Sequence, residues 1–221
     1  MSINRSDLII FQDSARLLAG FTKIPLSLNT LFSEVSMQQR FLDLPVVPVR
    51  LKQIHSTLIF KGDSVAPLID GDGLYTSEKN VLLITSHADC VPLYLYSDNL
   101  ILLSHCGRAG TFNGMVEKSL EIMLSGSEPG GIKALIGPGI CGKCYEVGEA
   151  VYREFSTRYR PDSPEFRVDL PRVIKTILIN SGIPADNITS SGLCTCHDPS
   201  FFSFRRDGTK MRNAAFFMLK S

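Results

Sequence analysis

Several features that mark specialised classes of protein are missing from this 221-residue sequence. Tryptophan is absent, and 23 lysines and arginines balance 22 aspartates and glutamates without forming a basic block. Such a balance is not typical of proteins that bind nucleic acid or anionic membranes. The apolar run Leu8–Phe11 is far shorter than a signal-peptide core or a membrane span. The sequence therefore predicts a cytoplasmic protein that binds neither nucleic acid nor a membrane.

Nothing in the composition indicates a disulfide-stabilised or multi-domain protein. The six cysteines are expected to be free thiols or metal ligands in a reducing compartment. Hydrophobic residues make up 44% of the chain and charged residues 20%, which is enough apolar material for a sizeable core. No repeat, low-complexity segment or linker divides the sequence, so we expect one domain over residues 1–221.

Short apolar runs bounded by glycine, aspartate or asparagine predict β-strands. The predicted strands are Val46–Lys52, Thr57–Phe60, Val81–Thr85, Pro92–Tyr96, Leu100–Ser104, Lys133–Ile136 and Ala214–Leu219. Apolar residues at helical spacing predict helices over Met115–Leu124 and Glu146–Tyr159, and from the N-cap Asp169 to Gly182. Because strands and helices do not alternate strictly, the predicted fold class is α+β.

Three potential metal ligands lie at the ends of predicted strands. His55 follows an apolar strand, Cys90 lies in the loop between two strands, and His105 leads into a glycine-rich segment at 107–110. Two imidazoles and one thiolate leave a fourth position on a zinc ion free for water, which becomes a nucleophile near neutral pH. The pattern favours a catalytic zinc site.

The same residues allow other interpretations, because no local motif such as HExxH joins them. Composition alone favours ordinary core histidines and a buried thiol. Cys90 could also be a nucleophile activated by His105 and oriented by Asp89. Asp89 could equally carry a proton, support a ligand or cap a loop. His87 is a substitute ligand, although in a loop we expect it to contact solvent or substrate.

A second set of metal ligands lies in Cys141-Gly-Lys-Cys144 and Cys194-Thr-Cys196-His197. Four thiols and an imidazole are enough for a structural zinc site, and a CxxC pair can also be redox-active. One CxxC followed by CxC-His is less specific than two CxxC pairs, so packing roles are favoured for these cysteines.

Two arginines and several phenylalanines near the end of the chain also have two interpretations. Arg205 and Arg206 could bind phosphate through paired hydrogen bonds, or they could pair with Glu146 or Asp169. A structural role is favoured for one of the two arginines. The phenylalanines are expected in the core rather than stacked on a substrate; they are Phe201, Phe202, Phe204, Phe216 and Phe217.

Many short sequence blocks occur in a fixed order from about residue 50 to the end. The blocks are Gln53-Ile54-His55, residues 70–76 and 88–93, His105 with its glycines, residues 136–140, 144–148 and 168–170, Cys194-Thr195, and residues 202–208. In these blocks the chain resembles the YfiH-like family, also described as multicopper polyphenol oxidase or laccase-domain proteins. The segment at about 1–45 is short and matches poorly.

The resemblance implies a compact fold in which two packed mixed β-sheets are flanked by helices, as α/β/β/α layers. It implies a zinc ion held by His55, Cys90 and His105. The family resembles purine nucleoside enzymes that phosphorolyse adenosine, inosine, guanosine and methylthioadenosine and that deaminate adenosine. The catalytic residues are then expected to be Cys90, His105 and Asp89.

For the remaining contacts we expect a purine nucleoside and phosphate to be bound by Gln53, Arg108 and Arg205. The protein is expected to be a monomer or a weak homodimer. The alternatives are a peptidoglycan-precursor editing amidase on the same zinc or Cys90, a copper-type polyphenol oxidase, and a non-catalytic interaction module. A laccase needs several coppers and many histidines, and the four histidines here are too few.

One departure from the family concerns the loop that follows His105. The family has Trp-Arg after the first glycine, in His-Ala-Gly-Trp-Arg-Gly-Thr. Here His105-Cys106-Gly107-Arg108-Ala109-Gly110-Thr111 lacks the tryptophan, and the arginine is either shifted by one position or lost. If that arginine binds phosphate, phosphorolysis is expected to weaken while the metal site persists.

Overall fold

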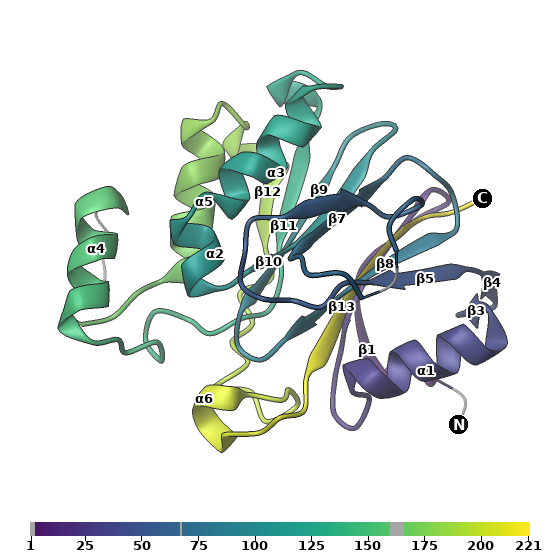
Figure 1. Ribbon diagram of the computed structural model, residues 1–221, viewed down its shortest axis with the longest axis horizontal. Coiled ribbons are helices and arrows are strands. Elements are labelled where there is room, and N and C mark those ends of the chain that lie inside the picture. The colour runs from purple at the N-terminus through teal and green to yellow at the C-terminus, as the bar shows by residue number, and fades with distance from the viewer. Residues whose placement is uncertain (1–2, 67, 160–165) are drawn as a thin grey trace.

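The computed structural model describes residues 3–66, 68–159 and 166–221 and arranges them in four layers (Figure 1). Two β-sheets pack face to face, and helices cover their outer faces. The predicted α+β fold with two packed mixed sheets flanked by helices is therefore confirmed.

The first sheet has five strands in the order β1, β2, β13, β8, β5. Their bounds are β1 Leu8–Asp13, β2 Leu17–Thr22, β13 Asn213–Leu219, β8 Val81–His87 and β5 Val47–Arg50. All neighbours are antiparallel except β5, which runs parallel to β8. The centre of the sheet therefore holds β13, from the other end of the sequence, between β2 and β8.

The second sheet has six strands in the order β12, β11, β9, β10, β7, β6. Their bounds are β12 Ile188–Ser190, β11 Lys133–Ile136, β9 Val91–Tyr96, β10 Ile101–Cys106, β7 Gly73–Thr76 and β6 Ile59–Lys61. The outer pairs β11–β12 and β6–β7 are parallel, and the inner pairs are antiparallel. A small separate hairpin joins β3 (Arg40–Phe41) to β4 (Leu44–Pro45).

Helices lie on the outer side of each sheet. α1 (Leu28–Gln38) covers the first sheet, while α2 (Arg108–Phe112), α3 (Met115–Leu124) and α5 (Leu170–Asn180) cover the second. α4 (Glu149–Tyr159) lies beyond them, and α6 (Phe204–Asp207) is a single turn. Short 3-10 turns occupy Arg5–Asp7, Pro129–Gly131 and Ala185–Asn187. No helix in the described ranges is long and apolar enough to cross a membrane.

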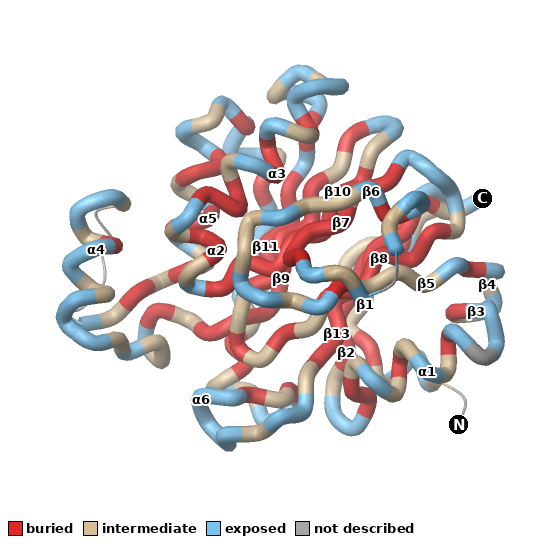
Figure 2. Tube along the Cα trace, in the orientation of Figure 1, coloured by how far each residue is buried: buried red, intermediate tan, exposed pale blue. Residues whose placement is uncertain are grey.

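Strand alternation explains why the layers hold together. Along β13, Phe216 faces α1, whereas Phe217 faces the other sheet. Along β10, Leu103 joins the core between the sheets, whereas Leu102 joins the core beneath the helices. Both faces of these central strands are buried (Figure 2), so each residue contributes apolar surface to one of two cores.

Most predicted elements appear with small shifts in their bounds. The helix Met115–Leu124 and the strand Lys133–Ile136 match fully, and Asp169 caps α5 by accepting a hydrogen bond from the Arg172 amide. The helix predicted from Glu146 begins only at Glu149, because Glu146 forms a β-bridge with Arg167.

Candidate functional site

Three side chains that are far apart in the sequence converge in one cluster. His55 lies in the loop between β5 and β6, Cys90 in the loop between β8 and β9, and His105 within β10. Their donor atoms all lie within 4.8 Å of one another, and Cys90 Sγ is 3.8 Å from His55 Nε2. Ligand atoms around one tetrahedral zinc ion lie roughly 3.5 Å to 4 Å apart. The cluster is therefore compact enough to hold a single ion.

The buried carboxylate of Asp72 organises this cluster. Its Oδ1 lies 2.8 Å from His105 Nδ1 and accepts a hydrogen bond from the His55 amide. Its Oδ2 accepts hydrogen bonds from the amide and hydroxyl of Ser56. Burial raises the pKa of Asp72, but its hydrogen bonds with His105 and Ser56 outweigh this and lower the pKa to about 2. The carboxylate thus holds the His105 ring through Nδ1 and leaves Nε2 able to bind a metal ion. Carboxylates that are hydrogen-bonded to metal-bound histidines act in the same way.

The backbone at His55 is held in the left-handed region, with φ of 60°. Residues other than glycine adopt this region uncommonly, although histidine does so more often than most. The amides of Ile54, His55 and Ser56 all point to the Asp72 carboxylate. These three hydrogen bonds offset the conformational cost and place the imidazole beside Cys90.

The absence of a side chain at Gly107 makes room for two of the proposed metal ligands, His55 and Cys90. A Cβ at this position would lie 2.8 Å from His55 Cδ2 and 2.9 Å from Cys90 Sγ. Both distances are below normal van der Waals contact, so any side chain here would push two of the three ligands away. The glycine that follows His105 and Cys106 therefore has a steric role at the cluster.

His87 is the last residue of β8 and is fully buried, so the expectation that it contacts solvent was wrong. The strand continues two residues beyond its predicted end. The His87 Nδ1–H donates to the Cys90 carbonyl at 3.0 Å, and Nε2 accepts from the Thr85 hydroxyl at 2.8 Å. Burial holds the pKa of His87 well below its usual value. The neutral imidazole thus fixes the backbone at Cys90.

The Cys90 thiol and the His105 imidazole form a charge pair. Burial raises the pKa of Cys90, but the charge of His105 and its hydrogen bond outweigh burial and lower the pKa to about 6. Burial likewise lowers the pKa of His105, while the Cys90 charge and the Asp72 hydrogen bond raise it to about 9. The thiolate, which is the metal-binding and nucleophilic form of cysteine, is therefore the stable form of Cys90 at neutral pH.

Asp89 lies beside the cluster, and both of its carboxylate oxygens already have partners. Oδ1 accepts a hydrogen bond from the Thr195 hydroxyl at 2.7 Å, and Oδ2 accepts one from the Arg205 amide at 2.8 Å. The backbone carbonyl of Asp89 accepts from the Ile140 amide. These contacts join the loop of Asp89 to three other segments around the cavity.

The cluster opens into a cavity of about 380 Å³, within the range of small-molecule sites. Three arginines line it, Arg108 at the start of α2, Arg205 at α6, and Arg212. The other lining residues are His55, Ala88, Asp89, Cys90, Ile140, Tyr145, Leu170 and Phe204. The cavity thus combines metal-ligating, cationic and aromatic side chains, and Phe204 departs from the expected core position.

Tyr145 lies against Arg205 in this cavity. The Arg205 guanidinium lies 5.1 Å from the centre of the Tyr145 ring, and its Nη1 donates to the Glu146 carbonyl at 2.9 Å. Burial raises the pKa of Tyr145 despite the nearby charges of Arg108 and Arg205. The phenol therefore stays protonated at neutral pH and can donate a hydrogen bond into the cavity.

Gln53, which is expected to contact the substrate, is hydrogen-bonded to Ser86 and is not among the residues that line the cavity. Its Nε2 donates to the Ser86 carbonyl at 2.9 Å, while its Oε1 accepts from the Ser86 amide and hydroxyl. These contacts join the loop that carries His55 to β8. The side chain therefore supports a ligand loop.

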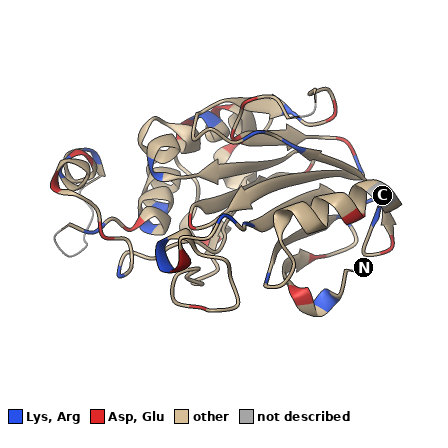
Figure 3. Ribbon diagram, turned by 60° about the horizontal axis from the view of Figure 1, so that its bottom comes forward, with Lys and Arg blue, Asp and Glu red and all other residues tan. Residues whose placement is uncertain are grey.

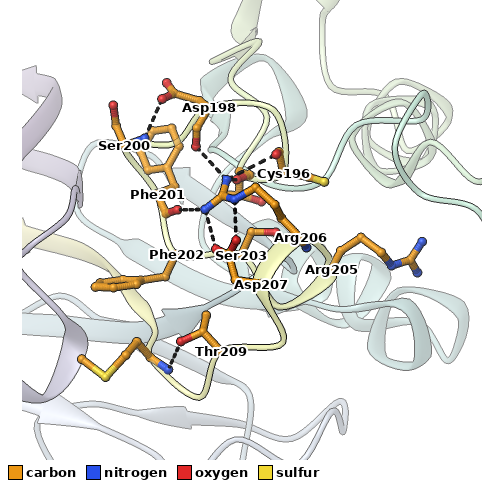
Figure 4. A network of polar contacts seen from close by, with 12 residues as sticks. Cys196, Asp198, Ser200, Phe201, Phe202, Ser203, Arg205, Arg206, Asp207 and Thr209 are labelled. Atoms are coloured by element: carbon orange, nitrogen blue, oxygen red, sulfur yellow. Dashed lines mark hydrogen bonds and ion pairs between the residues drawn. The ribbon is translucent and has the colours of Figure 1, made fainter.

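Arg205 and Arg206 are adjacent but extend in different directions (Figure 4). The Arg206 guanidinium donates to the backbone carbonyls of Thr195, Cys196, Asp198 and Phe201 and pairs with Asp207. One of the two arginines thus has a structural role, as favoured, although Arg206 pairs with Asp207 rather than with Glu146 or Asp169.

Charges of both signs are interspersed over the described chain (Figure 3). At α6 the basic and acidic residues stand next to each other, as Arg205, Arg206 and Asp207. The arginines of the cavity are thus a local feature and not the edge of an extended basic face.

An α/β/β/α fold with a histidine–cysteine–histidine cluster at a cavity suggests a metal-binding enzyme. The sequence pattern of the family described as "Multi-copper polyphenol oxidoreductase laccase" matches residues 33–220. The chain belongs to this family, which confirms the resemblance found in the sequence. The family and the cluster together suggest a bound metal ion.

Several relatives of the chain have names that state an activity. Purine nucleoside phosphorylase YlmD of Bacillus subtilis (strain 168) is 38% identical over 154 residues, 63% of this chain and 55% of the relative. The match thus spans about half the length of that protein. Purine nucleoside phosphorylase Cj1217c of Campylobacter jejuni is 33% identical over 176 residues, 78% of this chain and 77% of the relative.

A further relative and a solved structure extend the comparison. Adenosine deaminase RL5, from an unknown prokaryotic organism, is 32% identical over 62% of this chain and 57% of its own length. The crystal structure of YlmD from Geobacillus stearothermophilus superposes with a TM-score of 0.80 at 27% identity, over 96% of this chain and 99% of that chain. The four-layer fold is therefore shared along almost the whole length.

Proposed function

We propose that this chain is a zinc-dependent purine nucleoside enzyme. It would phosphorolyse adenosine, inosine, guanosine and methylthioadenosine and deaminate adenosine, acting in the cytoplasm as a monomer or weak homodimer. The observation that carries the proposal is the placement of His55, Cys90 and His105 at a cavity whose wall bears Arg108 and Arg205. The names of the relatives give the reaction class.

The donor set fits zinc. His55, Cys90 and His105 would supply two imidazoles and a thiolate, Asp72 orients one imidazole, and Gly107 leaves the necessary room. A zinc ion bound there would polarise the oxygen of a water or phosphate and lower the pKa of a bound water. Copper-dependent phenol oxidation is less well supported, because a multicopper centre needs more imidazoles and His87 is already hydrogen-bonded on both nitrogens.

The residues of the cavity account for phosphate binding. Arg108 and Arg205 present guanidinium groups to the cavity and can bind phosphate through paired hydrogen bonds. In phosphorolysis a phosphate oxygen forms a bond to C1′ of the ribose while the bond from C1′ to the purine nitrogen breaks. The electron pair leaves with the purine, which takes up a proton. Holding phosphate and nucleoside together lowers the entropic part of the barrier.

Tyr145 and Phe204 provide aromatic surface for the purine in the same cavity. The protonated Tyr145 phenol can donate a hydrogen bond to a phosphate oxygen or to a purine nitrogen. In deamination, water adds to C6 of adenosine and ammonia leaves, so the reaction needs no phosphate. The two reactions therefore differ in their need for phosphate and share one purine site.

The decisive experiment measures metal content and turnover together. Purified protein is incubated with adenosine and with inosine, with and without phosphate, alongside Cys90→Ala. We expect about one equivalent of zinc in the wild-type protein to be lost in Cys90→Ala. Free adenine or hypoxanthine should form only when phosphate is present. Inosine should form from adenosine without phosphate.

Two results would contradict the proposal. Turnover of neither nucleoside by protein with zinc bound through Cys90 would favour an amide or other substrate. Copper in place of zinc, together with oxidation of a phenol, would favour the polyphenol oxidase alternative.

A further inference from the structure

A second group of potential metal ligands lies outside the proposed active site. It consists of Cys141, Cys144, Cys194 and His197, whose donor atoms all lie within 4.8 Å of one another. Cys141 Sγ is 3.9 Å from His197 Nδ1, close to the separation of two ligand atoms on one tetrahedral ion. From this geometry we propose that the protein holds a second, structural zinc ion here, with three thiolates and one imidazole as ligands.

The ligands come from two loops that the second sheet places side by side. Cys141 and Cys144 follow β11, whereas Cys194 and His197 follow β12. Because β11 and β12 are parallel neighbours, both loops leave the sheet at the same edge. A β-bridge between Gly139 and Cys194 continues the pairing into the loops. The approach of the four donors is thus a consequence of the sheet.

Each loop presents two ligands from a tight turn. The Cys144 amide donates to the Cys141 carbonyl at 3.0 Å, and the Asp198 amide donates to the Cys194 carbonyl at 3.0 Å. The resulting spacing is Cys-x2-Cys on one loop and Cys-x2-His on the other, which is typical of four-ligand structural zinc sites. Cys196 lies between the two ligands of the second loop and is not part of the group.

Packing alone does not account for this group of side chains. The Cys141 amide donates a hydrogen bond to Cys194 Sγ at 3.3 Å, which joins the two ligand loops at one of the sulfurs. Only Cys194 of the four is buried; Cys141 and Cys144 are half-buried and His197 is exposed. Three ligands with solvent access contribute little to a hydrophobic core, so packing alone does not explain why they meet. No disulfide joins the described cysteines.

The site would fasten the wall of the cavity. Tyr145 follows Cys144 directly, and Arg205 donates to the Cys144 and Glu146 carbonyls. Thr195 follows Cys194 and donates to Asp89. An ion that ties the two loops together would hold Tyr145, Arg205 and Asp89 in place without touching the substrate. With four protein ligands it would have no position for water, as in structural zinc sites.

The test counts zinc in a background that lacks the first site. Protein prepared without chelators and with added zinc is analysed by mass spectrometry of the metal. We expect two zinc ions per wild-type chain, one in Cys90→Ala, and none in Cys90→Ala/Cys144→Ser. Cys90→Ala/Cys196→Ser is the matched control and should keep one, because Cys196 is a neighbouring thiol outside the ligand group.

Cobalt supplies a second readout that does not depend on catalysis. Cobalt bound to the Cys90→Ala protein should give the visible bands of a tetrahedral ion and strong thiolate charge-transfer absorption. Both should disappear on Cys144→Ser and persist on Cys196→Ser. If Cys144→Ser does not fold, the wild-type zinc count and the cobalt spectrum of Cys90→Ala still show whether a second ion is bound to thiolates.

Three outcomes would overturn the proposal: no metal in folded Cys90→Ala, zinc that persists in Cys90→Ala/Cys144→Ser, or thiol titration showing a disulfide between these cysteines. The zinc count in the Cys90→Ala background is independent of purine turnover. Failure of this proposal is therefore distinguishable from failure of the proposed function.

Discussion

Asp72 and His105 form a buried carboxylate–imidazole pair, with Oδ1 and Nδ1 2.8 Å apart and the carboxylate fully shielded from solvent. The same carboxylate holds the amides around His55. Two of the three proposed ligands thus depend on one side chain that does not itself belong to the cluster. This relationship makes Asp72 the natural starting point for testing the site.

Asp72→Asn should weaken metal binding about 10- to 100-fold, as loss of an outer partner of a metal ligand typically does. The substitution removes the charge that orients His105 and loosens the loop of His55. Zinc affinity is measured by competition with a chromophoric chelator. Asp70→Asn is the control, since Asp70 forms only an exposed ion pair with Lys52. Equal zinc affinities for the two variants would contradict this role.

Gly107→Ala should abolish zinc binding through Cys90 while leaving the rest of the fold intact. The added methyl group would overlap His55 Cδ2 and Cys90 Sγ, so the three donors could not approach one ion. Metal analysis and circular dichroism check both parts of the expectation. Gly126→Ala is a suitable control, because a Cβ there meets no atom within 4 Å. Full zinc occupancy in Gly107→Ala would show that the ligands lie elsewhere.

We expect Arg205→Ala to impair phosphate binding and Arg206→Ala to lower the stability of the fold. Arg205→Ala should raise the KM for phosphate at least tenfold with little change in melting temperature. Arg206→Ala should destabilise the protein by about 2 kcal/mol or more, because charged hydrogen bonds to several backbone carbonyls are lost. Phosphate kinetics and thermal unfolding of both variants give the comparison. A reversed pattern would exchange the roles assigned to the two arginines.

Removal of the metal should expose a reactive Cys90. Its lowered pKa means that the thiolate forms as the pH rises through about 6. After dialysis against a chelator, alkylation by iodoacetamide should therefore increase between about pH 5 and pH 7 and then level off. Cys106 is an internal control, because burial raises its pKa to about 12. Peptide mass spectrometry identifies the modified residue, and added zinc should protect Cys90. Alkylation that begins to rise only above pH 8 would contradict the charge pair with His105.

The sequence was sufficient for much of the fold because its central elements are strongly patterned. In the helix Met115–Leu124 and the strand Lys133–Ile136, apolar residues fall at positions that face the core. The local pattern therefore determines both elements. The expectation failed at Glu146, where pairing with Arg167 overrides helical spacing. Local pattern thus predicts elements well until a contact across the chain replaces them.

The proposed ligands of the candidate site could be picked out from the sequence, but the residues that hold them in place could not. His55, Cys90 and His105 stand out as ligand types at strand ends, whereas Asp72 resembles an ordinary turn residue between glycines. Its importance arises only when folding brings it to His105, 33 residues later. The burial of His87 was missed for the same reason, since its contact with Thr85 depends on how far the strand extends.

The position of β13 has a consequence for how the protein is made. This strand pairs with β2 and β8 at the centre of the first sheet, so residues 17–21 pair with residues 215–219. During synthesis β2 can pair with β1 early, but its other edge has no partner until β13 leaves the ribosome. Folding is therefore expected to be slow and completed only after translation of β13. A nascent chain stalled before Asn213 would be a substrate for chaperones rather than a partly active enzyme.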